Sequence, residues 1–133
     1  METKRSKNLK NTDIMKNKRT IKLNFEESEQ IVNLEYIHID ATWVDCKTLL
    51  QAHPNALLIE CKHKFLQTQF ALNDTDPCKL LVFDKDRKYV ATKTNYHKGT
   101  APFSFLISEQ YVLILPINYT LKKQKITSIS LLN

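Results

Sequence analysis

The chain has 133 residues, the size of one domain, and its apolar share of 42% is ordinary for a globular protein. It holds a single glycine, Gly99, and no apolar run near the roughly 18 residues that a membrane helix needs. These features exclude glycine-rich phosphate loops, dinucleotide fingerprints and a helical membrane span. The formal net charge is +6, and residues 1–22 carry all of it (8 − 2 = +6), which leaves residues 23–133 balanced (12 − 12 = 0).

Residues 1–19 are expected to form a basic, disordered arm, and residues 20–133 a single domain. The arm has almost no apolar periodicity, so it cannot offset the entropy lost on ordering. A solvated leader without a partner and a targeting role are two interpretations. In a third, the arm binds nucleic acid or another anionic partner non-specifically. The candidate residues for that contact are Lys4, Arg5, Lys7, Lys10, Lys16, Lys18 and Arg19.

Two strands are expected to open the domain. Ile21, Leu23 and Phe25 alternate with polar residues, which is typical of a half-buried strand. Residues 26–29 interrupt the pattern. Residues 31–39 are rich in β-branched side chains and predict a second strand.

One helix is predicted over Thr42–His53. Trp43, Cys46 and Leu50 fall at i, i+3 and i+7, which places them on one helical face. Pro54 should end the helix, because the residue before a proline avoids the helical region. The apolar face is expected to pack against a sheet.

The remaining elements are predicted strands, at residues 56–59, 65–72, 80–83, 88–93, 103–107, 111–115 and 125–131. Residues 84–87 and 108–110 are turns of hairpin length between neighbouring strands. Roughly eight strands and one helix predict an α+β fold. Its architecture is expected to be a mostly antiparallel bent sheet, or a partly open β-barrel, with one packed helix.

This arrangement resembles the domain of unknown function 192 family over about residues 36–130. In that family a strand leads into a Thr-initiated helix, an aromatic residue precedes a polar turn, and apolar strands follow. The corresponding segments here are residues 37–42, 70–75, 80–83 and 111–116. The Gly-Leu-Met that usually closes the family's helix is Leu-Gln-Ala in this chain. The resemblance implies a fold rather than an activity, because the family has no established reaction.

Three cysteines, Cys46, Cys61 and Cys78, form an odd set, which favours a reducing, cytoplasmic compartment over a disulfide framework. Cys61 and His63 would share one face of a strand and could join a zinc site or a nucleophile pair. Their spacing matches no zinc module, and a buried cysteine commonly behaves as a small apolar residue. We therefore expect no metal and no cofactor.

A ligand site is predicted at the polar turn after residue 72. Gln69, Asn73, Asp74 and Thr75 offer amide, carboxylate and hydroxyl groups beside apolar neighbours. In the alternative, Asn73 and Asp74 bond only the backbone of their own turn. The aspartates at 74, 76, 84 and 86 could likewise be turn formers, an acid–base pair or cation ligands, and turn formation is the preferred interpretation.

Three classes of function stay open. The first is a small non-enzymatic binding or accessory domain, whose protein partner could add to a sheet edge or whose ligand could sit beside the polar turn. The second is a nucleic-acid-associated protein that acts through its basic arm. The third is an enzyme whose site no motif marks. Salt-dependent binding that disappears when residues 1–22 are deleted would separate the second class from the first.

Overall fold

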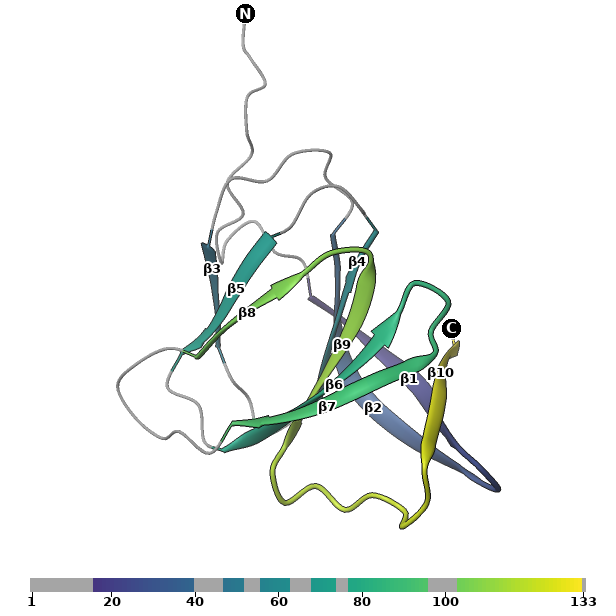
Figure 1. Cartoon of the computed structure of the whole chain (residues 1–133). Coiled ribbons are helices and arrows are strands. Elements are labelled where there is room, and N and C mark those ends of the chain that lie inside the picture. Colours follow the sequence, from purple (N-terminus) through teal and green to yellow (C-terminus); the bar gives the residue numbers. More distant parts are fainter. Residues whose placement is uncertain are drawn as a thin grey trace, which may run out of the picture.

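The computed structural model describes residues 16–39, 47–51, 56–62, 68–73, 77–95 and 103–132. These residues form ten β-strands in two sheets, and no helix occurs among them (Figure 1). The fold is therefore all-β in the described part of the chain. The expected bent, mostly antiparallel sheet is confirmed, whereas the α+β class is not.

The larger sheet has seven strands in the order β10-β1-β2-β4-β9-β6-β7. Its one parallel pair is β2 with β4, and its other neighbours are antiparallel. The strands are β1 (Lys16–Phe25), β2 (Glu29–Ile39), β4 (Ala56–Cys61), β6 (Cys78–Asp84), β7 (Tyr89–Asn95), β9 (Gln110–Pro116) and β10 (Ile126–Leu132).

This sheet curls into a half-barrel whose two edge strands meet at one end (Figure 1). Lys88, just before β7, forms an isolated antiparallel bridge with Ser128 of β10. The amide of Ile129 donates to the carbonyl of Arg87 at 3.1 Å. The concave side encloses an apolar core that includes Ile21, Leu23, Val32, Leu58, Leu81, Phe83 and Leu113.

The connection between β9 and β10, residues 117–125, runs past the end of this core. The Lys79 ammonium donates to the Tyr119 carbonyl at 3.1 Å, and the Gln30 side chain donates to the Thr120 carbonyl at 2.8 Å. Tyr119 and Leu121 pack against the concave core. The connection is thus tied to strands β2 and β6.

Three further strands form a smaller sheet in the order β3-β5-β8. They are β3 (Lys47–Gln51), β5 (Thr68–Asn73) and β8 (Phe103–Ile107). A second apolar cluster joins the two sheets and includes Phe70, Leu72 and Ile107 from the small sheet with Ile37, Ile59 and Leu80 from the large one. Strand β4 lies between the two clusters, which explains why all six of its residues are buried.

The predicted helix over Thr42–His53 is wrong in its central part, because Lys47–Gln51 is strand β3 and pairs in parallel with β5. Trp43, Cys46 and His53 lie outside the described residues. A short segment with two adjacent leucines satisfies a helical period as well as an extended one. Pairing with β5 supplies its backbone partners, and such tertiary pairing overrides a local helical pattern.

The turn at residues 108–110 does not form a hairpin. Strand β8 ends at Ile107 in the small sheet, and β9 begins at Gln110 in the large sheet, so this turn carries the chain between sheets. Glu109 takes a left-handed conformation there (φ 47°). In sequence, a corner and a hairpin both appear as a short polar gap between apolar strands.

Strand β1 begins at Lys16, four residues before the domain start that was expected at Thr20. Residues 16–19 pair with Leu34–Ile37 of β2 and belong to the sheet, not to a detached arm. Residues 1–15 lie outside the described part. Within that part, no helix is long and apolar enough to cross a membrane.

Candidate functional site

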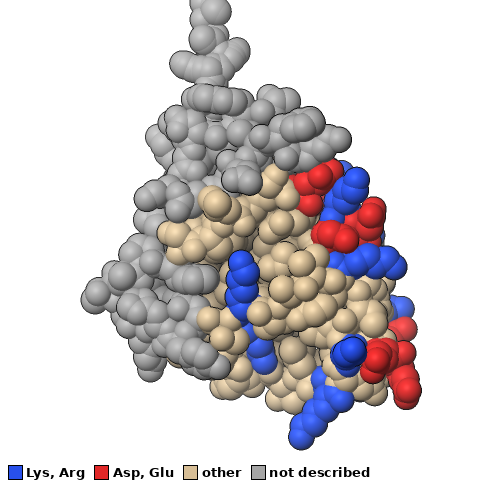
Figure 2. All heavy atoms as spheres, in the orientation of Figure 1, with Lys and Arg blue, Asp and Glu red and all other residues tan. Residues whose placement is uncertain are grey.

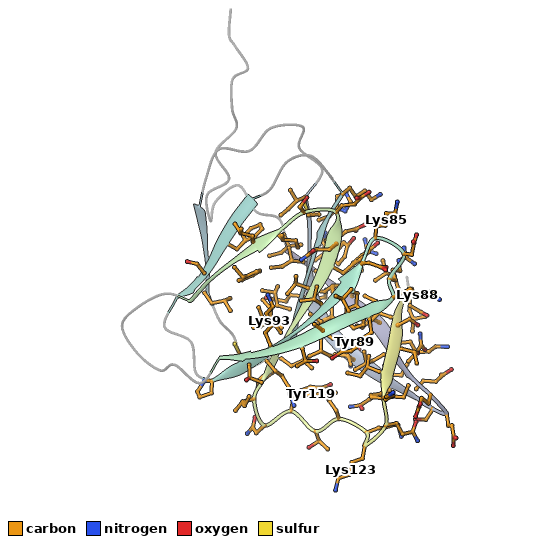
Figure 3. The ribbon with its side chains drawn as sticks, in the orientation of Figure 1. Lys85, Lys88, Tyr89, Lys93, Tyr119 and Lys123 are labelled. Carbon is orange, nitrogen blue, oxygen red and sulfur yellow. The ribbon has the colours of Figure 1, made fainter. Side chains whose placement is uncertain are left out.

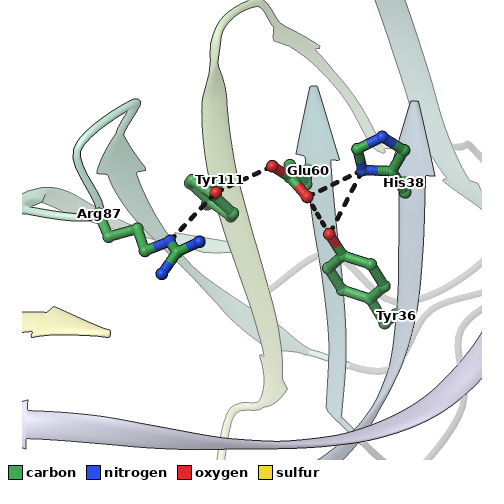
Figure 4. Close-up of polar contacts among 5 residues, drawn as sticks. All are labelled: Tyr36, His38, Glu60, Arg87 and Tyr111. Carbon is green, nitrogen blue, oxygen red and sulfur yellow. Dashed lines mark hydrogen bonds and ion pairs between the residues drawn. The ribbon is translucent and has the colours of Figure 1, made fainter. Parts of the chain in front are cut away.

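A buried carboxylate, Glu60 on β4, is the centre of the densest polar network in the structure (Figure 4). Its side chain points to the concave side of the half-barrel, and the residue is 4% exposed. Among the described residues it is the one buried residue with a charged side chain. Strand pairing places it between His38 of β2 and Tyr111 of β9.

Three side chains contact the Glu60 carboxylate. The Tyr36 hydroxyl donates to Oε1, and His38 Nδ1 lies 2.9 Å from the same oxygen. The Tyr111 hydroxyl donates to Oε2 at 2.9 Å. Both carboxylate oxygens therefore have partners, as a buried charge requires.

Two arginines cover the tyrosines of the network. Arg87 Nε donates to the Tyr111 hydroxyl at 3.2 Å, and its guanidinium carbon lies 5.7 Å from the centre of that ring. The guanidinium carbon of Arg19 lies 4.9 Å from the centre of the Tyr36 ring. Both contacts have cation–π geometry. Burial raises the pKa of Tyr111, the bond from Arg87 opposes that rise, and the Glu60 carboxylate adds to it.

The network favours a structural role over catalysis. The Glu60 side chain is 5% exposed, whereas that of His38 is 36% exposed. We conclude that the network holds β2, β4 and β9 together and gives the enzyme hypothesis no support.

The sequence holds one signal that could have located this network. An acidic residue, Glu60, stands within the apolar run of β4, and such a charge must find partners if the strand is buried. The identity of the partners could not be predicted. They depend on the parallel pairing of β2 with β4, which joins segments separated by an intervening strand of the other sheet.

The predicted ligand site stays a prediction. Gln69 and Asn73 are on β5, where they pair with Lys47 and Gln51 of β3. The structure describes only the backbone at these two positions, and Asp74 and Thr75 lie outside the described residues.

The predicted anion-binding residues also fall largely outside the described part. Lys4, Arg5, Lys7 and Lys10 lie outside it, and Lys16 is described only in its backbone. Lys18 and Arg19 are exposed on β1.

Asp84 is confirmed as a turn former. Its carboxylate accepts hydrogen bonds from the amides of Asp86 at 2.8 Å and Lys88 at 3.0 Å.

Cys61 and Cys78 carry buried thiols within the apolar cluster between the sheets, where they pack as small apolar residues. His63 lies outside the described residues, so the Cys61–His63 pair stays untested.

A second candidate site is the side of the half-barrel formed by residues 84–95 and 117–125. These two segments contain seven basic and two acidic residues, a surplus of 7 − 2 = +5. All described residues together contain 14 basic and eight acidic residues (14 − 8 = +6). The two segments hold half of the described basic residues and +5 of the described net charge of +6. We call these residues the basic flank: Lys85, Lys88, Tyr89, Lys93, Tyr119, Lys122, Lys123 and Lys125. Lys93 pairs with Leu80 of the cluster between the sheets, so its side chain lies on the opposite face of β7 from that of Tyr89.

Figure 3 shows the basic flank, with lysines along β7, its preceding turn and the 117–125 connection. In the space-filling view of the same side, blue Lys and Arg groups are spread over a largely uncharged surface, and toward the right-hand edge they lie beside red acidic groups (Figure 2). The six lysines of the flank are all exposed. Their charges are therefore available to an anionic ligand.

Two tyrosines anchor the flank to the core. Tyr89 and Tyr119 are half-buried and pack against the concave apolar cluster. The Tyr89 ring meets Phe83 edge to face at 5.9 Å, and its hydroxyl bonds Thr92 Oγ1 at 2.5 Å. These contacts hold both rings against the concave core.

Comparison with known proteins gives no relative: no family model, no curated protein and no solved structure matches this chain. The resemblance to the domain of unknown function 192 family accordingly stays a prediction. Function must be argued from the residues of this chain.

Proposed function

We propose that this protein is a small non-enzymatic binding module whose basic flank holds a single-stranded nucleic acid. The observation that carries the proposal is the +5 surplus of residues 84–95 and 117–125 beside two anchored tyrosines. Lysines that neutralise phosphates release counterions, which supplies most of the affinity for a nucleic acid. Tyrosine rings held at a basic surface stack on bases with little sequence preference.

Acidic residues lie beside the flank as well as within it: the Glu26 amide donates to the Lys125 carbonyl at 3.1 Å, and the Glu27 amide donates to the Gln124 side chain at 3.1 Å. Asp84 lies at the end of β6, but its carboxylate accepts two backbone amides and stabilises the turn. Asp86 is the other acidic residue in these two segments. The 117–125 connection holds three lysines and no acidic residue.

The basic residues near the N-terminus offer a second contact with the same ligand. Lys4, Arg5, Lys7 and Lys10 would add non-specific phosphate contacts to those of the flank. Their contribution can be measured separately, because deleting residues 1–15 leaves the whole of β1 in place.

The proposal is tested by fluorescence anisotropy of the full chain with labelled single-stranded DNA and RNA at several salt concentrations. We expect affinity to fall steeply as salt rises. The double variant Lys93→Glu/Lys123→Glu should bind at least about tenfold more weakly. It should also lower the slope of log affinity against log salt by roughly 1.4, or about 0.7 for each lost phosphate contact on a single strand.

The matched control is Lys22→Glu/Lys62→Glu, which makes the same change in charge away from the flank. Lys22 makes only a surface ion pair with Glu29 at 3.4 Å, and Lys62 is exposed. This variant should retain most of the affinity. If both double variants bind like the parent and the deletion of residues 1–15 abolishes binding, the arm alone is the site. If the parent binds neither DNA nor RNA, the proposed function is wrong.

A further inference from the structure

Among the described residues, the outer edge of β7 is open beyond Lys88. In the seven-stranded sheet β7 has one neighbour, β6, and beyond the bridge at Lys88 no described strand pairs with its other side. Val90 is 57% exposed, and Thr92, Lys93 and Thr94 are exposed as well. An open strand edge offers its unpaired amides and carbonyls to another chain.

The alternation of backbone bonds shows which groups of β7 face outward. The Ile117 amide donates to the Pro77 carbonyl at 3.0 Å, so the odd-numbered residues of β6 bond toward β9. The even-numbered residues then bond toward β7, which agrees with the bond from the Asp84 amide to the Lys88 carbonyl at 2.9 Å. Leu80 pairs with Lys93, and Leu81 with Thr92. The amides and carbonyls of Thr92 and Thr94 therefore point away from β6.

We propose that two copies of this chain associate through this edge, with their β7 strands antiparallel about a two-fold axis at Thr92. Thr92 then pairs with Thr92 of the second copy and exchanges both backbone hydrogen bonds with it. Ala91 lies opposite Lys93 of the second copy, and the regular pairing ends before Val90, which is the unpaired residue of the β-bulge between Tyr89 and Ala91. Pairs of β-branched and Thr side chains across strands stabilise a sheet.

Repulsion between lysines favours this register over the one with its axis at Lys93. An axis at Lys93 would place two lysines directly opposite each other, and like charges at opposed positions destabilise a strand pair. An axis at Thr92 separates these lysines along the strand and places each opposite a small residue. This register lets the edge pair with its own copy without opposed lysines, whereas the basic N-terminal residues would bring further positive charge close to Lys93, so a second copy is favoured as the occupant.

Association through β7 does not depend on the proposed nucleic-acid binding, and salt separates the two. Nucleic-acid affinity should fall with salt. Association of two basic surfaces should strengthen, because added ions screen their repulsion. Sedimentation velocity on the full chain should show a dimer whose fraction rises with protein and salt concentration.

Two variants locate the contact. Thr92→Pro removes an outward-facing amide without breaking the β6–β7 ladder, and it also removes the hydroxyl bond with Tyr89, so it should give a folded monomer with a slightly lower melting temperature. Thr92→Cys should form a dimer-linking disulfide on mild oxidation. Bonded antiparallel partners have Cα atoms about 5.5 Å apart, within disulfide range.

Lys93→Cys is the matched control, because Lys93 is exposed on the same strand and its substitution leaves the native cysteines unchanged. In the proposed register the two thiols introduced at position 93 are too far apart to join. A chain that stays monomeric at all concentrations, with no cross-link at position 92, overturns the proposal. So does a dimer that cross-links at position 93 instead, or at neither position. A cross-link at position 92 supports the proposed β7–β7 contact even if Thr92→Pro fails to fold.

Discussion

Among the described residues, Glu60 is the one buried residue with a charged side chain. It has a buried carboxylate, and Tyr36, His38 and Tyr111 contact its two oxygens from β2 and β9. Unlike the apolar residues around it, it connects neighbouring strands through directional bonds. Removing it leaves two buried hydroxyls without their acceptor, which costs more than the bonds themselves contribute.

We expect Glu60→Ala to lower the free energy of unfolding by about 3 kcal/mol or more, as for other losses of a buried polar network. Glu60→Gln should cost less, because the amide oxygen still accepts one hydroxyl. Urea denaturation measures both values. The control Glu29→Ala removes a partner of Lys22 that is itself 57% exposed, and it should change stability by less than about 1 kcal/mol. Equal stability of Glu60→Ala and the parent would show that the network contributes nothing.

Tyr111 makes the free energy of unfolding depend on pH in the alkaline range. Burial raises its pKa above the ordinary 10.0, so the folded chain retains a proton that the unfolded chain has begun to lose. Its stabilising contribution is complete below pH 10 and is lost as the pH rises above that value. Unfolding free energies measured from pH 8 to pH 11 should therefore decline more steeply for the parent than for Tyr111→Phe. Identical profiles would contradict this assignment.

The turn between β6 and β7 shows how a chain with one glycine makes a tight hairpin. The Arg87 amide donates to the Asp84 carbonyl at 2.8 Å, and Arg87 takes the left-handed conformation (φ 68°) that usually favours glycine. Its side chain reaches the Tyr111 hydroxyl. One residue therefore combines an unfavourable backbone conformation with a favourable side-chain contact.

Substitution at Arg87 separates the two effects. Arg87→Ala loses the side-chain contacts and keeps the left-handed backbone, whereas Arg87→Gly loses the same contacts and relieves the backbone. We expect both variants to be less stable than the parent, with the glycine variant about 1 kcal/mol more stable than the alanine variant. Thermal and urea unfolding of the three proteins measure the difference. An alanine variant as stable as the glycine variant would show that this backbone carries no strain.

At the scale of elements, alternation, β-branched residues and short apolar runs predicted most strands, and these patterns failed at β3. Ile21, Leu23 and Phe25 alternate as β1 requires, and all three are buried. The segment at 47–51 has no such alternation, and it is a strand because β5 lies beside it. A pattern within one segment could not reveal a partner about twenty residues further along the chain. The corner at Glu109 was missed for the same reason.

At the scale of the molecule, the basic flank could not be recognised from the net charge of the sequence. Residues 23–133 sum to zero charge, so the sequence showed a surplus only near the N-terminus. The fold brings residues 84–95 and 117–125 to one side, where their surplus is +5. Four of the eight basic residues in the N-terminal segment 1–22 belong to β1, which begins at Lys16.

Truncation tests where the domain begins. Deleting residues 1–15 should leave the melting temperature nearly unchanged. Deleting residues 1–19 also removes the pairing of residues 16–19 with β2 and the contact of Arg19 with Tyr36, and should lower the melting temperature by several degrees. Differential scanning calorimetry of the two truncated chains compares them directly. Equal melting temperatures would place the boundary after residue 19.

The order in which the chain visits the two sheets has a consequence for how it folds. From β2 to β5 successive strands alternate between the large sheet and the small one, and the parallel pairs β2–β4 and β3–β5 each enclose a strand of the other sheet. Neither sheet can be completed from a continuous piece of chain. Long loops must therefore close before most native contacts exist, which slows folding. We expect the chain to fold in milliseconds to seconds, as other proteins dominated by non-local strand pairing do, and a ribosome must release β9 before the centre of the large sheet can form.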